Sequence, residues 1–199
     1  MLRTATMVSL AATSGVALAQ PAITVEIDEP VLLPGESTTV TLLAGFDSSD
    51  FAIATIGFDF MTSVGSDGWS EAELIRPMDF FGMPGVPTST GYDDVLANQI
   101  NSAAIGGPSY ADTTNPIPFW RATYTAPSDV RGVMEVDLST VTNRYDVYVG
   151  RLSWIPESRL DELVEGSGTI AVITAPASAV VLAHGVVRDS RRRGIGTGG

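Results

Sequence analysis

Residues 53–61 have the sequence IATIGFDFM, which carries the clearest structural signal of the chain. Ile56, Phe58 and Phe60 occupy alternate positions, and in an extended strand alternate side chains share one face. Alternation of this kind favours a strand with one buried side rather than a helix. The stretch therefore predicts a β-sheet that packs on a second layer.

The same alternation recurs on both sides of this stretch. Pro34-Gly35 and Pro127-Ser128-Asp129 mark turns between such segments. The further predicted strands cover Ile23–Asp28, Thr38–Leu43, Phe119–Thr125, Val133–Val141, Tyr145–Val149 and Thr169–Thr174. Short strands separated by turns predict an all-β fold, an antiparallel β-sandwich.

Two regions depart from this pattern. Residues 156–164 carry acidic residues early and an apolar stripe after them, and Gly166 follows, so one short helix is expected there. The segment 62–118 is rich in Gly and Pro and predicts a long excursion across the sandwich. Within it, 72–75 has the character of a strand, and 94–100 fits a helical turn or a strand.

One motif in the body resembles a known family. Pro34–Leu42 (PGESTTVTL), followed by Gly57–Phe60 (GFDF), is similar to the opening strands of cohesin-like and related carbohydrate-module sandwiches. The resemblance covers about 40 residues. It implies an immunoglobulin- or cohesin-like sandwich for the body of the chain.

Composition excludes several kinds of chemistry. The 199 residues are 44% hydrophobic, enough for one domain with a real core. The chain has no Cys and no Lys, and its single His is His184. Thiol catalysis, disulfides, Schiff-base chemistry and a Ser-His-Asp triad in the body are thereby excluded.

The first residues have the features of a secretory signal peptide. Arg3 gives a positive start, Met7–Leu18 is mostly apolar, and Ala17-Leu18-Ala19 is an A-x-A cleavage site followed by Gln20. We expect cleavage between Ala19 and Gln20. A buried N-terminal helix or a membrane anchor is the alternative, although the apolar run is shorter than the roughly 20 residues that span a bilayer.

The other end has a stop-transfer pattern. Ala175-Pro176-Ala177 precedes the apolar run 179–187, and Arg191, Arg192 and Arg193 follow before a Gly-rich end. This order resembles the C-terminal sorting signal of PEP-CTERM exported proteins, in its planctomycete-type Pro-Ala-Pro variant. The resemblance implies handling by an exosortase-type membrane enzyme and delivery to the cell surface or extracellular matrix. The alternative is a basic C-terminus that merely follows the last strand.

These ends leave residues 20–174 as one β-sandwich domain, between a signal peptide at 1–19 and a sorting tail at 175–199. The ends take five Arg and one Asp with them, so the body keeps 6 Arg and 22 acidic residues, a net charge of −16. Nucleic acid is not expected as a partner, because phosphate binding needs a basic face. Anionic membrane surfaces are disfavoured for the same reason.

The acidic residues form two candidate groups. Asp47, Asp50 and Asp59 surround one turn and strand, and Asp93-Asp94 form a second group. Clustered carboxylates can bind calcium, but solvated turns are the main expectation, because no calcium-loop motif is present. Two carboxylates can also cleave a glycosidic bond, yet no catalytic motif occurs. We therefore predict no catalytic residue, no cofactor and no metal ligand.

Three tryptophans are candidates for contact with a glycan. Trp69 follows Asp67-Gly68 in the irregular region and is the best candidate for a surface ring. Trp120 lies in a predicted strand and Trp154 near the predicted helix, where both are expected to pack.

Two function classes remain. The first is an exported, non-catalytic surface or matrix protein with an adhesive or scaffolding role, whose partner can be an extracellular polysaccharide, a neighbouring protein or the matrix. The second is a carbohydrate-binding module or a carbohydrate-active enzyme. A groove with two carboxylates and exposed aromatic rings would favour the second, and a smooth acidic sandwich with buried tryptophans would favour the first.

Overall fold

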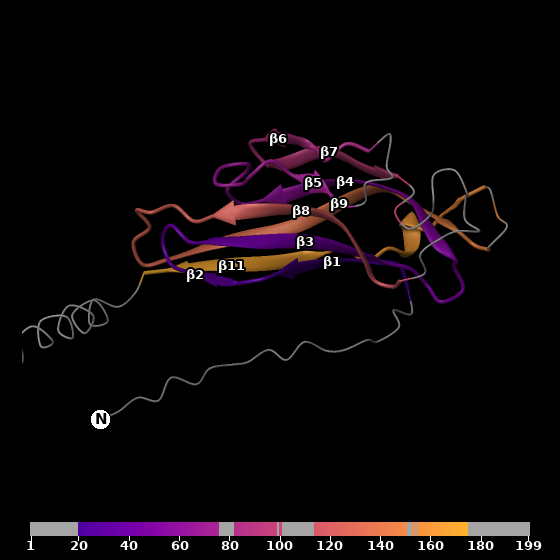
Figure 1. Ribbon diagram of the computed structural model, residues 1–199, viewed down its shortest axis with the longest axis horizontal. Helices are drawn as coiled ribbons and strands as arrows, with labels where there is room; N and C mark the ends of the chain where they lie inside the picture. The colour runs from indigo at the N-terminus through magenta and orange to yellow at the C-terminus, as the bar shows by residue number, and fades with distance from the viewer. Residues whose placement is uncertain are drawn as a thin grey trace, which may run out of the picture.

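The computed structural model describes residues 20–75, 82–98, 100, 114–150, 153 and 155–174. These residues form two β-sheets packed face to face, with the chain crossing repeatedly between them (Figure 1). The sequence prediction of an all-β sandwich is confirmed.

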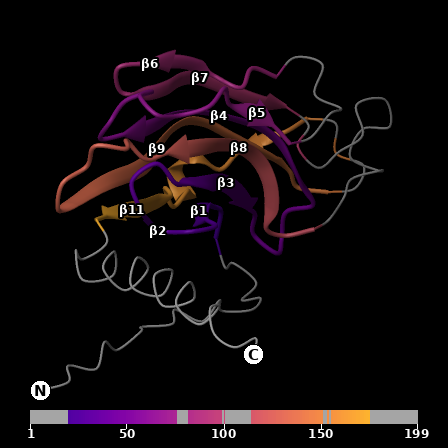
Figure 2. The same cartoon turned by 60° about the vertical axis from the view of Figure 1, so that its left-hand side comes forward.

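The strands of the described chain, in sequence order, are β1 (Ala22–Ile27), β2 (Val31–Leu32), β3 (Ser37–Gly45), β4 (Ala52–Thr62), β5 (Glu73–Leu74), β6 (Val86–Thr88), β7 (Gly91–Asn98), β8 (Ile117–Thr125), β9 (Val133–Tyr148), β10 (Glu157–Ser158) and β11 (Ser167–Ile173). The four-stranded sheet has the order β1-β3-β8-β5, and the seven-stranded sheet has the order β2-β11-β9-β4-β7-β6 with β10 attached to β9. Figure 2 shows β3 and β8 of the smaller sheet lying across β9 and β4 of the larger one.

Nearly all pairing is antiparallel, as predicted, but β2 pairs with β11 in parallel. The chain leaves β1 in one sheet and enters β2 in the other, where the amide of Ala171 donates to the carbonyl of Pro30 at 2.8 Å. Leu32 turns inward and is 2% exposed. This crossing joins the two sheets along one edge of the sandwich.

Aromatic rings fill the space between the sheets. Phe58 on β4 meets the rings of Phe119 and Trp120 on β8 edge-on, with ring centroids 5.6 and 6.3 Å apart. The ring centroids of Phe60 and Trp120 are 4.8 Å apart. These side chains are fully buried, and such pairs add about 1 kcal/mol each to the stabilisation from buried area. The alternation of residues 53–61 therefore corresponds to the core face of the central strand.

Two predicted strands form a single strand. The chain runs as β9 through Val133–Tyr148 without interruption, although the sequence predicted a break at 142–144. The pairing with β4 shifts register between Gly57 and Phe58, so one residue of β9 is skipped. Such a bulge reverses the alternation for one position, which explains why the sequence looked like two strands.

The predicted helix over 156–164 is wrong. Glu157 and Ser158 form β10 against β9, and only Leu160–Glu162 make a short 3₁₀ turn, η2. An isolated helix of this length is unstable in water unless it packs an apolar face. Here the backbone amide of Arg159 donates to the carbonyl of Tyr145 at 2.8 Å, which favours the extended form.

The excursion over residues 62–118 is partly ordered. Glu73 and Leu74 form β5, within the stretch expected to have strand character. β7 makes residues 91–98 a strand, which resolves the alternative between a helical turn and a strand. Residues 76–81, 99 and 101–113 lie outside the described residues.

The expected signal peptide and sorting tail also lie outside the described residues. Ala17 and Ala19 precede the first described residue, Gln20, which is exposed. Ala175, Pro176, Ala177 and the Arg191–Arg193 cluster follow the last one, Thr174. In the described part of the chain, no helix has the length and apolar character needed to cross a bilayer.

Candidate functional site

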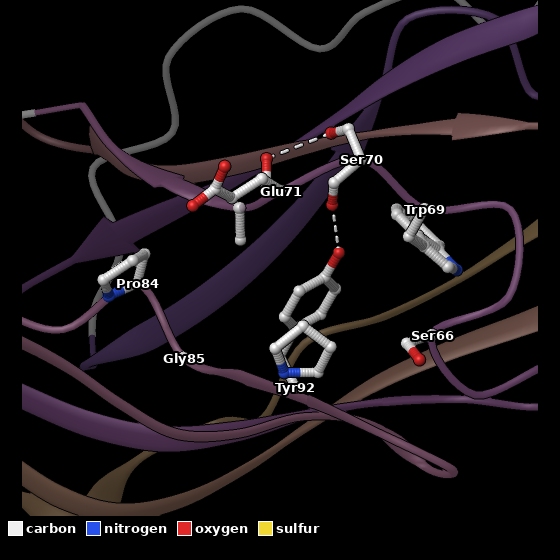
Figure 3. Close-up of a pocket in the computed structure, with 9 residues that line it drawn as sticks. Ser66, Trp69, Ser70, Glu71, Pro84, Gly85 and Tyr92 are labelled. Carbon is white, nitrogen blue, oxygen red and sulfur yellow. Dashed lines mark hydrogen bonds between the residues drawn. The ribbon is translucent and has the colours of Figure 1, made fainter.

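A pocket of about 320 Å³ opens where the loop after β4 meets β6 and β7. Its lining residues are Ser66, Trp69, Ser70, Glu71, Ala72, Pro84, Gly85, Pro87 and Tyr92. Figure 3 shows Glu71 and Pro84 on one side, Trp69 and Ser66 on the other, and Tyr92 between them. The volume lies near the lower end of the usual range for small-molecule sites, roughly 300–1,000 Å³.

Hydrogen bonds from buried rings hold the walls of the pocket. The hydroxyl of Tyr92 donates to the carbonyl of Ser70, and the indole N–H of Trp120 donates to the carbonyl of Pro84 at 2.9 Å. Gly85 has φ +103°, and a Cβ at this position would lie 2.7 Å from Cγ2 of Val95. Glycine is therefore required where this wall passes over β7.

Trp69, the predicted glycan contact, is half-buried and lines the pocket. Its ring packs edge-on against Phe60 and tilted against Tyr124, with ring centroids 5.4 and 5.2 Å apart. Its Nε1 is buried and has no hydrogen-bond partner in the described structure. Trp69 thus belongs both to the core and to the wall of the pocket, and it is not a freely exposed platform for a sugar.

The two other tryptophans differ in outcome. Trp120 is fully buried, which confirms its prediction as a core residue. Trp154 lies outside the described residues.

Glu71 supplies the only charged side chain among the described residues that line the pocket. It is exposed, and no hydrogen bond or ion pair of its carboxylate is present in the described structure. Burial, and then the negative charge of Glu71, raise the pKa of Tyr92. A single carboxylate cannot supply the acid and base of a glycosidase, which requires two.

Asp47 and Asp50 lie in one turn, where the amide of Asp50 donates to the carbonyl of Asp47 at 3.0 Å, whereas Asp59 lies on β4. Asp47 accepts hydrogen bonds from Ser49, which lower its pKa, whereas the buried Asp50 is paired with Arg159. The carboxylate of Asp59 accepts a hydrogen bond from the backbone amide of Asp94 at 2.9 Å. The described residues contain no cluster of three or more metal-ligating side chains, and nothing further tests the calcium alternative to solvated turns.

The outer face of β9, β4 and β7 carries a group of carboxylates. Buried residues such as Val136 and Leu138 alternate along β9 with outward carboxylates. The acidic residues of this face, hereafter the acidic face, are Asp59, Asp94, Glu135, Asp137 and Asp146. Arg144 is the only base on these three strands as described, and it is already hydrogen bonded to Asp146 at 2.6 Å. The acidic face therefore has a net negative charge.

The outer face of the four-stranded sheet is different, because hydroxyl side chains dominate it. Thr39 on β3 pairs with Thr123 on β8, while Val40 and Ala122 beside them are buried. Ser37 and Thr125 share a hydrogen bond of 2.8 Å between their hydroxyls. The sandwich thus has one acidic face and one face of hydroxyl groups.

The sequence did not predict the pocket or the acidic face. The pocket is built from segments around residues 66–72 and 84–92, whose proximity depends on tertiary structure. The Trp69-Ser70-Glu71 triplet was the available signal, since it places an aromatic ring and a carboxylate side by side in an irregular segment.

Solved structures with a similar fold are cohesin modules. A cohesin module from the family 33 glycoside hydrolase of Clostridium perfringens is 9% identical, with a TM-score of 0.50, over 79% of this chain and 99% of that one. The seventh ScaB type I cohesin of Pseudobacteroides cellulosolvens is 19% identical, with a TM-score of 0.50, over 78% of this chain and 95% of its own.

A further match is a chain of a type I cohesin–dockerin complex from Clostridium thermocellum, 10% identical with a TM-score of 0.50, over 82% of this chain and 100% of that one. No protein-family model matches the sequence, and neither does any curated protein. At these identities the likeness concerns the fold, and it confirms the cohesin-like resemblance of the body. The described part of this chain has the fold of a cohesin-like β-sandwich.

Proposed function

We propose that the body of this protein is a non-catalytic module that binds another protein, with an adhesive or scaffolding role at the cell surface or in the extracellular matrix. The partner presents a basic surface and docks on the acidic face.

The acidic face is the observation that carries this proposal. β9, β4 and β7 are the longest neighbouring strands of the larger sheet, with 16, 11 and 8 residues, and form a continuous surface. Val141 lies among the carboxylates and is 54% exposed, so the face also offers apolar area. A charged face of this kind steers a partner of opposite charge and sets its orientation.

The fold supports a binding role. One structure with the same fold is a cohesin–dockerin complex, in which two protein modules are bound to each other. A similar role for this chain is an inference from shape, because fold alone does not determine function.

The pocket and the tryptophans favour this function over the carbohydrate-active alternative. A glycosidase would need two carboxylates flanking the bond, about 5–10 Å apart. Glu71 is alone among the described residues of the pocket, and Trp120 is in the core. The expected signal peptide and sorting tail add export and handling by an exosortase-type enzyme to the proposal.

A photocrosslinking experiment tests the proposal. The photoreactive residue p-benzoylphenylalanine is placed at Val141 on the acidic face, or at Thr39 on the hydroxyl face as the matched control. In extracellular material of the cells that make the protein, we expect protein adducts from Val141 and few from Thr39. The combined change Glu135→Gln and Asp137→Asn should reduce the Val141 adducts, as should high salt.

Two results would contradict the proposal. Equal adducts from both positions would mean that the acidic face is not the binding surface. Release of new reducing ends from a polysaccharide by the purified protein, abolished by substituting one Asp or Glu, would mean that the protein is an enzyme.

A further inference from the structure

We propose that the pocket beside Trp69 receives the cationic end of an arginine or lysine side chain presented by a protein partner. The inference rests on the proposed function, since it takes the basic side chain from a protein that the module binds. It adds a second site, distinct from the acidic face.

Charge is the first argument. Glu71 is the only charged group among the described residues of the pocket, and its carboxylate has no partner there. Glu73, two residues further on, differs because it is paired with Arg121. No described residue of the chain therefore competes with an incoming cation for the Glu71 carboxylate.

The walls supply the second argument. Trp69 contributes the uncovered part of its aromatic ring, and Ala72, Pro84 and Pro87 contribute apolar surface. Aromatic rings attract ammonium and guanidinium groups, with tryptophan the strongest. Apolar walls suit the methylene stem of a long basic side chain. The ring, apolar walls and one carboxylate together match both parts of such a side chain.

Preorganisation is the third argument. Tyr92 is 1% exposed and is held by its hydrogen bond to Ser70, and Trp120 holds Pro84. A site whose walls are already in place loses little conformational entropy when a ligand enters. Its volume of about 320 Å³ suits one side chain better than a polymer.

A neutral sugar ring is the other occupant to consider. Either occupant would meet only the part of the Trp69 ring that Phe60 and Tyr124 leave uncovered, so the ring does not distinguish them. A neutral sugar also leaves the charge of Glu71 without a counterion. The observations therefore favour a basic side chain, and the experiment below includes the sugar.

The test compares two acetylated five-residue peptides, one with a central arginine and one with citrulline, its neutral isostere. Binding to the full chain is followed by NMR through the indole N–H signal of Trp69. We expect the arginine peptide to bind about tenfold more tightly. Glu71→Gln should remove this difference, whereas the matched control Glu73→Gln should preserve it.

Three outcomes would overturn the inference. Equal affinity of the two peptides would show that the pocket does not recognise charge. A preference unaffected by Glu71→Gln would place the site elsewhere. A Trp69 signal that moves with cellotriose and not with the arginine peptide would identify a glycan pocket. If the arginine peptide were not preferred while crosslinking at Val141 still occurred, this inference would be refuted and the proposed function would be unaffected.

Discussion

The guanidinium group of Arg159 donates two hydrogen bonds to the carboxylate of Asp50, 109 residues earlier in the chain, at 3.0 and 3.3 Å. The Asp50 side chain is completely buried, and that of Arg159 is 21% exposed. The hydrogen bonds that Arg159 donates to Asp50 raise the pKa of Arg159, which favours its charged form. It ties the loop before β4 to the segment between β10 and η2.

Removing one partner of this pair should be costly. We expect Arg159→Gln to lower the free energy of unfolding by about 3 kcal/mol, because it leaves the buried carboxylate without its counterion. Arg144→Gln is the control, since Arg144 is 52% exposed in its pair with Asp146. That change should cost less than about 1 kcal/mol. Urea denaturation of both variants measures the difference, and equal costs would show that the buried Arg159–Asp50 pair adds no more stability than the exposed pair.

Gly91 permits the close approach of β7 to β4. It has φ +134°, and a Cβ at this position would overlap the carbonyl oxygen of Phe60. We expect Gly91→Ala to lower stability by more than about 3 kcal/mol, since the backbone of the central strand would have to move. Gly132 has a similar positive φ, +85°, but open space around its missing Cβ.

The matched change Gly132→Ala should therefore cost only the conformational strain of a left-handed residue, about 1–2 kcal/mol. Thermal unfolding of the two variants separates the cost of steric overlap with Phe60 from the cost of backbone strain. If both variants lost the same stability, the contact with Phe60 would not be the cause.

Alternation identified the strands wherever one face is buried and the other solvated. Val136 and Leu138 alternate with exposed residues, and the sequence located their strand. The sequence prediction failed at Asn143, where it placed a break between two strands. The bulge at this position depends on Gly57 of the neighbouring strand, where a Cβ would lie 2.6 Å from the Asn143 side chain. Information that resides in a partner strand is not visible in the pattern of one segment.

The helix prediction and the missed pocket have a related explanation. Residues 156–164 have a helical pattern, but contacts with β9 and with Asp50 determine their conformation. Trp69 was identified as a candidate contact from its polar neighbours, whereas its burial depends on Phe60 and Tyr124 from distant strands. Local sequence indicated which residues were unusual, and only tertiary contacts showed how each is used.

Tyr145 should make stability fall at alkaline pH. Its hydroxyl is buried and donates to the carbonyl of Gly45 at 2.6 Å. Burial, and then the charge of Asp50, raise the pKa of Tyr145 well above its ordinary value of 10.0. Its contribution to stability is thus complete below the unfolded pKa and is lost as pH rises from there through the folded pKa.

Urea denaturation between pH 8 and pH 11 tests this. Wild-type stability should decline above about pH 10. Tyr145→Phe should start about 1 kcal/mol lower, because the carbonyl of Gly45 loses its donor, and then decline less steeply. Some decline should remain, since burial also raises the pKa values of Tyr92 and Tyr124. An unchanged slope in Tyr145→Phe would contradict the assignment.

Asp94 is the non-glycine residue with positive φ in the described chain, at +57°. Its amide donates to the carboxylate of Asp59, so the strained backbone and two carboxylates meet on the acidic face. We expect Asp94→Gly to raise the free energy of unfolding by about 0.5 kcal/mol, because relief of the left-handed strain exceeds the entropy that glycine loses on folding.

Asp94→Asn is the control that removes the charge but keeps a side chain tolerant of this conformation. At low salt both variants should gain stability from reduced repulsion between carboxylates. At 0.5 M salt the Debye length is about 4–5 Å and exposed charges are screened, so only Asp94→Gly should remain more stable than wild type. If the two variants were equally stable at high salt, repulsion alone would account for the effect and the backbone at residue 94 would carry no strain.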